Sequence, residues 1–132
     1  MEIKSNFIII CDQAFLAAGT NNLNLIGIFT TMNAEQFPMT YRRFALVVNF
    51  DTDSLGMHTL QTKIVDGEGK ELLKSELQIN ITSSPFQVIA NFENFTFPVP
   101  GAYHIQVFID DRELGSRALM VNPIIKSKTN LA

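Results

Sequence analysis

The 132-residue chain has no tryptophan, a single cysteine and no long hydrophobic run. Because Cys11 has no partner, an internal disulfide framework is excluded, which is typical of proteins in a reducing compartment. No stretch approaches the roughly 18 consecutive apolar residues of a membrane-spanning helix. We therefore expect a cytoplasmic protein without membrane attachment.

An excess of positive charge is also missing. The 10 Lys and Arg residues and 13 Asp and Glu residues give a net charge of −3 and a pI of about 5.3. The densest basic spots are Arg42-Arg43 and Lys126 with Lys128. Neither spot forms the basic stripe of a nucleic-acid-binding surface, so we expect no nucleic-acid partner.

The apolar segment of residues 7–18 ends in small residues, as a secretory signal does. A signal needs an unbroken apolar stretch behind basic residues. Here Asp12 and Gln13 interrupt the stretch, and Glu2 precedes the only nearby lysine. We interpret the segment as a buried strand that begins the domain.

Period-2 alternation of apolar residues, typical of strands, dominates the chain, and no helical period exceeds two turns. The clearest unit is a hairpin over residues 97–121, in which Pro100-Gly101 enters the first strand and residues 110–112 reverse the chain. Gly27 lies inside an expected strand, where glycine indicates a bulge or a close approach. The expected strands cover residues 6–12, 23–31, 41–51, 58–66, 72–82 and 86–97, and the two arms of the hairpin.

About eight strands separated by turn signals predict an all-β fold, an antiparallel, immunoglobulin-like β-sandwich. Residues 32–40 are expected to be a connection with one helical turn at most, and Asp66-Gly67-Glu68-Gly69 to be a hairpin turn, since Asp-Gly suits positive φ. We expect one domain over residues 1–123 and a frayed tail over residues 124–132.

Residues 10–14 (ICDQA) and 23–29 (LNLIGIF) lie near the start of the chain, and residues 101–103 (GAY) and 114–116 (LGS) lie near its end. Together they resemble a family of small bacterial proteins that is catalogued only as a domain of unknown function. Asp111 stands where that family often has a turn glycine; Asp tolerates a left-handed conformation, so we expect the turn to survive at some cost. The resemblance implies a sandwich fold and a bacterial or phage setting. It carries no catalytic residues, and none is transferred.

The nucleophilic and basic side chains Cys11, His58 and His104 are candidates for a small enzyme. A reactive cysteine needs a histidine or a helix N-terminus nearby to lower its pKa, and the sequence places neither histidine beside Cys11. The alternative is a buried structural cysteine. Two histidines and one cysteine do not make a convincing zinc site, and no nucleotide-binding or nucleophile-elbow motif appears. We expect no enzymatic activity and no cofactor.

The acidic loops are the second candidate site. Asp51 and Asp53 follow one expected strand, and Asp110 and Asp111 follow another. Calcium prefers six to eight oxygen ligands, which paired aspartates at one end of a sandwich can supply. Aspartate is also common in turns because it caps backbone amides. A calcium-dependent binding domain therefore stays open as an alternative.

Apolar residues lie on both faces of several expected strands, which is more than a monomeric sandwich needs. Phe92 and Phe95 differ by three positions, so either a bulge intervenes near Glu93-Asn94 or one ring is exposed. Our leading hypothesis is a non-enzymatic interaction or assembly module that binds a protein partner or forms a homo-oligomer. The candidate interface residues are Val47, Ile89, Phe95 and Phe108.

Overall fold

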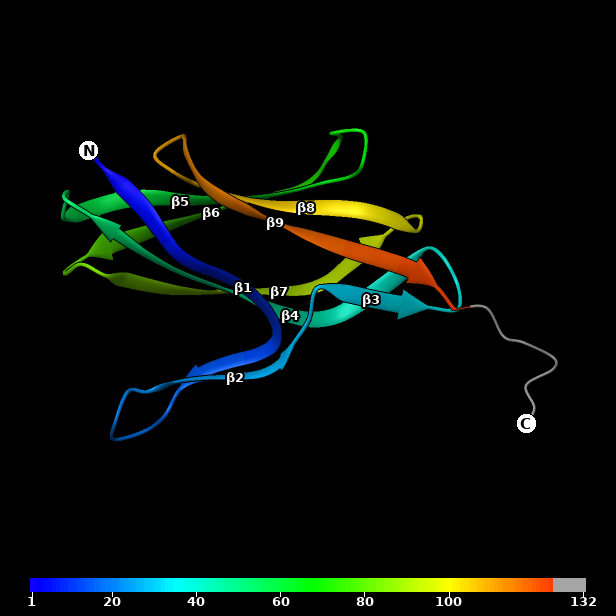
Figure 1. The fold of residues 1–132 in the computed structure, drawn as a ribbon, viewed down its shortest axis with the longest axis horizontal. Helices are drawn as coiled ribbons and strands as arrows, with labels where there is room; N and C mark the ends of the chain where they lie inside the picture. The colour runs from blue at the N-terminus through cyan, green and yellow to red at the C-terminus, as the bar shows by residue number, and fades with distance from the viewer. Residues whose placement is uncertain (125–132) are drawn as a thin grey trace.

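The computed structural model describes residues 1–124, so the expected tail, except for Ile124, lies outside the described residues. The described chain forms two sheets that face each other across one core (Figure 1). Within this part, no helix is long and apolar enough to cross a membrane. The strands are β1 (Ile3–Leu16), β2 (Leu23–Ile28), β3 (Thr31–Ala34), β4 (Met39–Thr52), β5 (Gly56–Val65), β6 (Glu71–Ile81), β7 (Phe86–Phe97), β8 (Gly101–Ile109) and β9 (Arg112–Pro123).

The strand order is that of an immunoglobulin-like sandwich. One sheet has the order β2-β1-β4-β7 and the other the order β3-β9-β8-β5-β6. Strands β1, β4 and β7 correspond to A, B and E, and β9, β8, β5 and β6 to G, F, C and C′. Tyr103, near the start of β8, donates a hydrogen bond of 2.5 Å from its hydroxyl to the carbonyl of Val99. This is the tyrosine corner of such domains, and it confirms the expected fold class.

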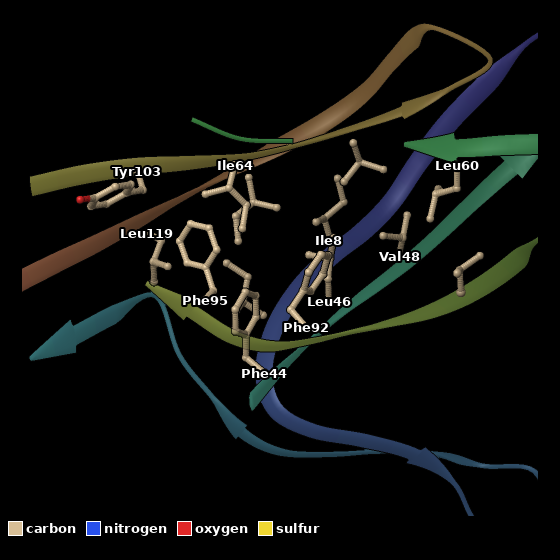
Figure 2. Packing of buried hydrophobic residues seen from close by; sticks show 14 of the residues in the cluster. Ile8, Phe44, Leu46, Val48, Leu60, Ile64, Phe92, Phe95, Tyr103 and Leu119 are labelled. Carbon is tan, nitrogen blue, oxygen red and sulfur yellow. The ribbon is translucent and has the colours of Figure 1, made fainter. Parts of the chain in front are cut away.

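The core between the sheets is built from strand faces that the sequence alternation predicts. Alternate residues of β4, from Phe44 to Phe50, are fully buried. They meet the buried face of β8 that begins at Tyr103 (Figure 2). Phe44 stacks on Phe92 with 5.1 Å between ring centroids. Aromatic and branched side chains therefore supply the core of a chain that has neither the tryptophan nor the disulfide of antibody domains.

The segment over residues 32–40 differs from its prediction. It contains β3, which pairs in parallel with β9 and aligns Met32 with Val121. The expectation of a purely antiparallel arrangement is therefore wrong at this edge, and the described strands number nine. Met32 and Ala34 are buried between exposed neighbours. This is the alternation of a strand, over too few residues to be recognised in the sequence.

The turns follow the predicted chemistry at two places and differ at a third. Asp110 and Asp111 both have positive φ, 47° and 68°, as a two-residue type I′ hairpin turn requires. At Gly27, which is left-handed at φ 71°, the Asp12 side chain lies where a Cβ would be, which is the close approach expected there. In the β5–β6 turn, however, Gly69 takes the positive φ of 85°, and Gly67 does not. There the Asp66 carboxylate accepts bonds from the amides of Glu68 and Lys70, which fixes the loop of residues 66–70.

Of the two alternatives for Phe92 and Phe95, an exposed ring is wrong, because both rings are buried in the core; the backbone is irregular at Asn94, but without the register shift of a bulge. Asn94 has a left-handed φ of 53°, and both Glu93 and Asn94 point to solvent. Strand β4, which pairs with β7, also exposes Arg42 and Arg43 beside this point. The pairing register is the same on both sides of it. In both strands the buried side chains therefore switch from one alternation to the other at this point, and neither strand has an extra residue.

Candidate functional site

The candidate catalytic residues are not brought together. Cys11 is fully buried on the outer face of the four-stranded sheet, and its thiol lies 3.2 Å from the carbonyl oxygen of Gln13. Burial, and next the charge of Asp12, raise the pKa of Cys11, so the reactive thiolate is disfavoured. His58 and His104 belong to the five-stranded sheet, across the main core. The cysteine–histidine hypothesis has no geometric support.

His58 instead contacts Asp110 and Ser54, which the sequence pattern did not connect with it. Its Nδ1 lies 2.5 Å from Oδ2 of Asp110, and its Nε2 lies 3.3 Å from Oγ of Ser54. These are the residue types of a hydrolase triad. However, Nε2 is closer to the carbonyl oxygen of Ser54, at 3.0 Å. A nitrogen that donates to this carbonyl cannot also accept the hydroxyl proton, so His58 is not placed as a general base.

The Asp110 carboxylate favours the charged form of His58 by raising its pKa. The hydrogen bond to Asp110 raises the pKa of His58, and the same bond lowers the pKa of Asp110. The other carboxylate oxygen of Asp110 accepts a bond from the amide of Thr59 at 2.9 Å. In its imidazolium form, His58 donates to the Asp110 carboxylate and to the Ser54 carbonyl. It thereby connects the loop that contains Ser54 to the β8–β9 turn.

The four candidate calcium ligands lie at one end of the sandwich but do not converge. Asp51 and Asp53 line a hollow that the guanidinium of Arg112 also lines. Asp53 accepts a bond of 2.8 Å from the amide of Glu2. Asp110 is held by His58, and Asp111 lines a different hollow. Within the described residues no group of three or more His, Cys, Asp or Glu side chains is arranged to hold a metal ion.

The four candidate interface residues divide into two kinds. Val47 and Phe95 are buried by the chain itself, so neither offers a surface to a partner. Ile89 is half-buried against the outer face of the four-stranded sheet. Phe108 is also half-buried, with Nζ of Lys63 5.0 Å from the centroid of its ring. The condition on which Phe95 was proposed, exposure, is not met.

The apolar residues on the outer face of the four-stranded sheet have an internal explanation. Cys11, Ala45 and Val47 form a second small core there, against which Leu23 and Leu25 of β2 pack. Figure 1 shows β1 bending sharply, so that its second half and β2 run along the far side of β4. The hairpin formed by β1 and β2 therefore covers part of this face, and this part of the apolar excess needs no partner.

The hairpin that covers this face exposes apolar side chains of its own. Phe15, Leu16, Ile26 and Ile28 are 45%, 49%, 52% and 61% exposed, and we call them the hairpin surface. Strand β2 is one edge of its sheet, and β7 is the other. The sequence reasoning missed this surface, although a signal was present. Residues 13–34 contain no charged residue or histidine, in a chain with 17% charged residues.

A hollow of about 370 Å³ opens where β1 and β2 diverge from β4. Its lining includes the half-buried Asp12, whose Oδ1 accepts a hydrogen bond from the hydroxyl of Tyr41. Burial, followed by the hydrogen bond to Asp12, raises the pKa of Tyr41 to about 12. The rings of Tyr41 and Phe29 lie 5.7 Å apart between centroids. The hollow thus combines a carboxylate with two aromatic rings.

Comparison with known proteins identifies one family and several solved structures that are similar to this chain. A family model, described as a family of unknown function (DUF6941), matches residues 6–122. No curated protein matches the sequence. A solved immunoglobulin-like protein from Pseudomonas aeruginosa is similar, with a TM-score of 0.47, 19% identity and coverage of 92% of this chain and 97% of that one.

Two larger proteins contain similar regions. One is an alkylpurine DNA glycosylase from Pseudomonas fluorescens, with a TM-score of 0.46 and 11% identity, covering 91% of this chain and 30% of that one. The other is a β-glucosidase from Listeria innocua, with a TM-score of 0.47 and 10% identity, covering 95% of this chain and 16% of that one. With identities this low and TM-scores below 0.5, these similarities say nothing about the activity of this chain.

Proposed function

The chain belongs to this family of unknown function, DUF6941, and from that premise we propose that it is a non-enzymatic interaction module that associates with a second copy of itself through β2. The observation that carries the proposal is the hairpin surface, in which an unpaired edge strand coincides with four exposed apolar side chains. An edge strand presents free amide and carbonyl groups on which another strand can pair.

The edge of β2 lacks the features that protect edges from pairing. Natural edges are shielded by charged side chains, by very short strands or by covering segments. Strand β6, the edge on the other sheet, carries Glu71, Lys74 and Glu76. Strand β3 has only four residues. Strand β2 carries no charge at all, and its exposed Ile26 and Ile28 flank the left-handed Gly27.

A second copy is the partner that this surface fits. A two-fold axis beside β2 would pair it antiparallel with itself and join two four-stranded sheets into one. Because residues 13–34 are uncharged, the two copies bring no like charges together. Because Ile26 and Ile28 are already about half buried, burying the rest of each would contribute roughly half of the 1.5–3 kcal/mol of a fully exposed side chain, before the entropic cost of binding is subtracted.

The test is the mass in solution by light scattering over a concentration series. We expect the wild type to form a dimer and the Ile26→Lys variant to be a monomer. Leu77→Lys is the matched control, because Leu77 is 43% exposed on the β6 edge; this variant should remain a dimer. A wild type that is monomeric at every concentration, or an Ile26→Lys variant that still dimerises, would contradict the proposal.

A further inference from the structure

We propose that the hollow at Asp12 binds a cationic group, an ammonium or a guanidinium carried by a ligand. The hollow lies wholly within one chain, between the bend of β1, the end of β2 and the start of β4. The proposal does not require self-association through β2, although the hollow shares Ile28 with the hairpin surface.

The first observation is a carboxylate that forms no ion pair within residues 1–124. Asp12 is half-buried and receives a hydrogen bond from Tyr41, which is uncharged. The ion pairs among the described residues are His58–Asp110, Lys63–Glu71 and Lys74–Glu76, and none includes Asp12. A partly buried charge without a partner is costly, and a cation from outside would offset that cost.

The second observation is the close fit of this carboxylate against Gly27, which leaves one of its oxygens without a hydrogen-bond donor among the described residues. A Cβ placed on Gly27 would overlap Oδ2 of Asp12. Gly27 is also left-handed, so the backbone and the absence of a side chain at this position both leave room for the carboxylate. Oδ1 receives the bond from Tyr41, which leaves Oδ2 without a hydrogen-bond donor among the hydrogen bonds of the described residues.

The third observation is the chemistry of the remaining wall. Phe29 and Tyr41 both line the hollow, and aromatic faces attract cations. Met32 and Met39 add polarisable sulfur atoms and apolar surface. A carboxylate beside aromatic and thioether groups favours a cation with an alkyl stem over an anion or a strongly polar neutral group.

Two arginines border a different hollow beside Asp12. Arg42 and Arg43 line the adjoining hollow of about 440 Å³, which shares Asp12 and Tyr41 with the first. Both arginines are exposed, and neither forms an ion pair with Asp12. Their charge disfavours a cation on that side, so the cation is expected on the side lined by Phe29.

The test is a titration of the labelled full chain by NMR with n-butylammonium and n-butylguanidinium. The neutral control probe is n-butanol. We expect saturable shifts of the Gly27, Phe29 and Tyr41 amides with both cations, and no saturation with butanol at the same concentrations. Equal effects of the neutral alcohol, or no saturable shift with either cation, would overturn the proposal. This arm uses wild-type protein and does not depend on a variant that folds.

Two variants locate the binding group. Asp12→Asn keeps an oxygen that can accept the Tyr41 hydroxyl and removes the charge, so we expect at least a tenfold loss of affinity for either cation. Asp111→Asn removes an exposed aspartate of the β8–β9 turn and should leave the affinity unchanged. An Asp12→Asn protein that folds and binds the cations as tightly as wild type would overturn the assignment.

A third arm distinguishes the source of the cation. An acetyl-Gly-Lys-Gly-amide peptide presents the same ammonium on a protein-like backbone. Tighter binding of this peptide than of butylammonium would support a lysine side chain of a partner, and equal or weaker binding would support a small-molecule amine. If dimerisation fails while the cations bind, only the proposed self-association is lost.

Discussion

The carboxylate of Asp12 occupies the space that a side chain on Gly27 would require. Strands β1 and β2 pair on both sides of this point, aligning Cys11 with Ile28 and Gln13 with Ile26. The contact therefore lies inside the hairpin that covers the second core and exposes the hairpin surface. A residue without a Cβ is needed here for two reasons, the left-handed backbone and the adjacent carboxylate.

Replacing Gly27 with alanine should therefore destabilise the fold by about 2 kcal/mol, of which roughly 1 kcal/mol is the left-handed conformation. Gly19→Ala is the matched control, because Gly19 has a φ of 87° but nothing within 4 Å of a Cβ. Urea denaturation of both variants measures the difference. Equal losses for the two would mean that the Asp12 contact is readily relieved.

The His58–Asp110 pair gives stability a defined pH dependence. The pKa of His58 is raised above 6.5, so its contribution is complete below pH 6.5 and is lost as the pH rises through the folded-state pKa. The pKa of Asp110 is lowered from 3.8, so its contribution is present above that value and is lost as the pH falls through the folded-state pKa.

The stabilising effect of the pair should therefore be greatest between pH 3.8 and pH 6.5. Because Asp110 is 41% exposed, we expect about 1 kcal/mol or less. Thermal unfolding of His58→Gln should show its largest deficit relative to wild type near pH 5 and a smaller one at pH 9. His104→Gln, at an exposed position, is the control. A deficit that grows towards pH 9 would have the wrong sign.

The β8–β9 turn should discriminate among substitutions at Asp111. Its φ of 68° is accessible to glycine and tolerable for aspartate, but strained for a β-branched residue. Asp111→Gly should match or slightly exceed wild-type stability, whereas Asp111→Val should lose about 1–2 kcal/mol. Chemical denaturation ranks the three proteins. A valine variant as stable as wild type would show that the turn changes its geometry.

The tyrosine corner should contribute through its hydroxyl as well as its ring. Tyr103→Phe keeps the aromatic contact with Phe97, whose centroid lies 5.0 Å away, and removes the bond to Val99. We expect a loss of about 1 kcal/mol in the free energy of unfolding. An unchanged midpoint in thermal and urea denaturation would mean that water replaces the hydroxyl at no cost.

The sequence predicted the elements that long alternation defines. Strands such as β4 and β8 alternate over many residues, and their buried faces follow directly. The turn at Asp110 was predictable because few residues accept its backbone angles. The four residues of β3 were not, since a strand this short carries too little pattern, and its parallel pairing with β9 is a tertiary event.

The candidate sites were less predictable because they depend on which strands become neighbours. Asp12 and Tyr41 are far apart in the sequence and meet only because β1 pairs with β4. Phe95 could not be assigned to the core without the face change at Asn94. The uncharged run over residues 13–34, by contrast, is legible in the sequence and marks the hairpin surface directly.

The claim that β2 pairs with a second copy is tested most directly by hydrogen exchange of the β2 amides at low and high protein concentration. The account predicts that protection of residues 23–28 rises with concentration, while the β6 edge is unaffected. In Ile26→Lys the same amides should exchange rapidly at every concentration. Exchange of β2 that is independent of concentration, in a protein that dimerises by light scattering, would place the interface elsewhere.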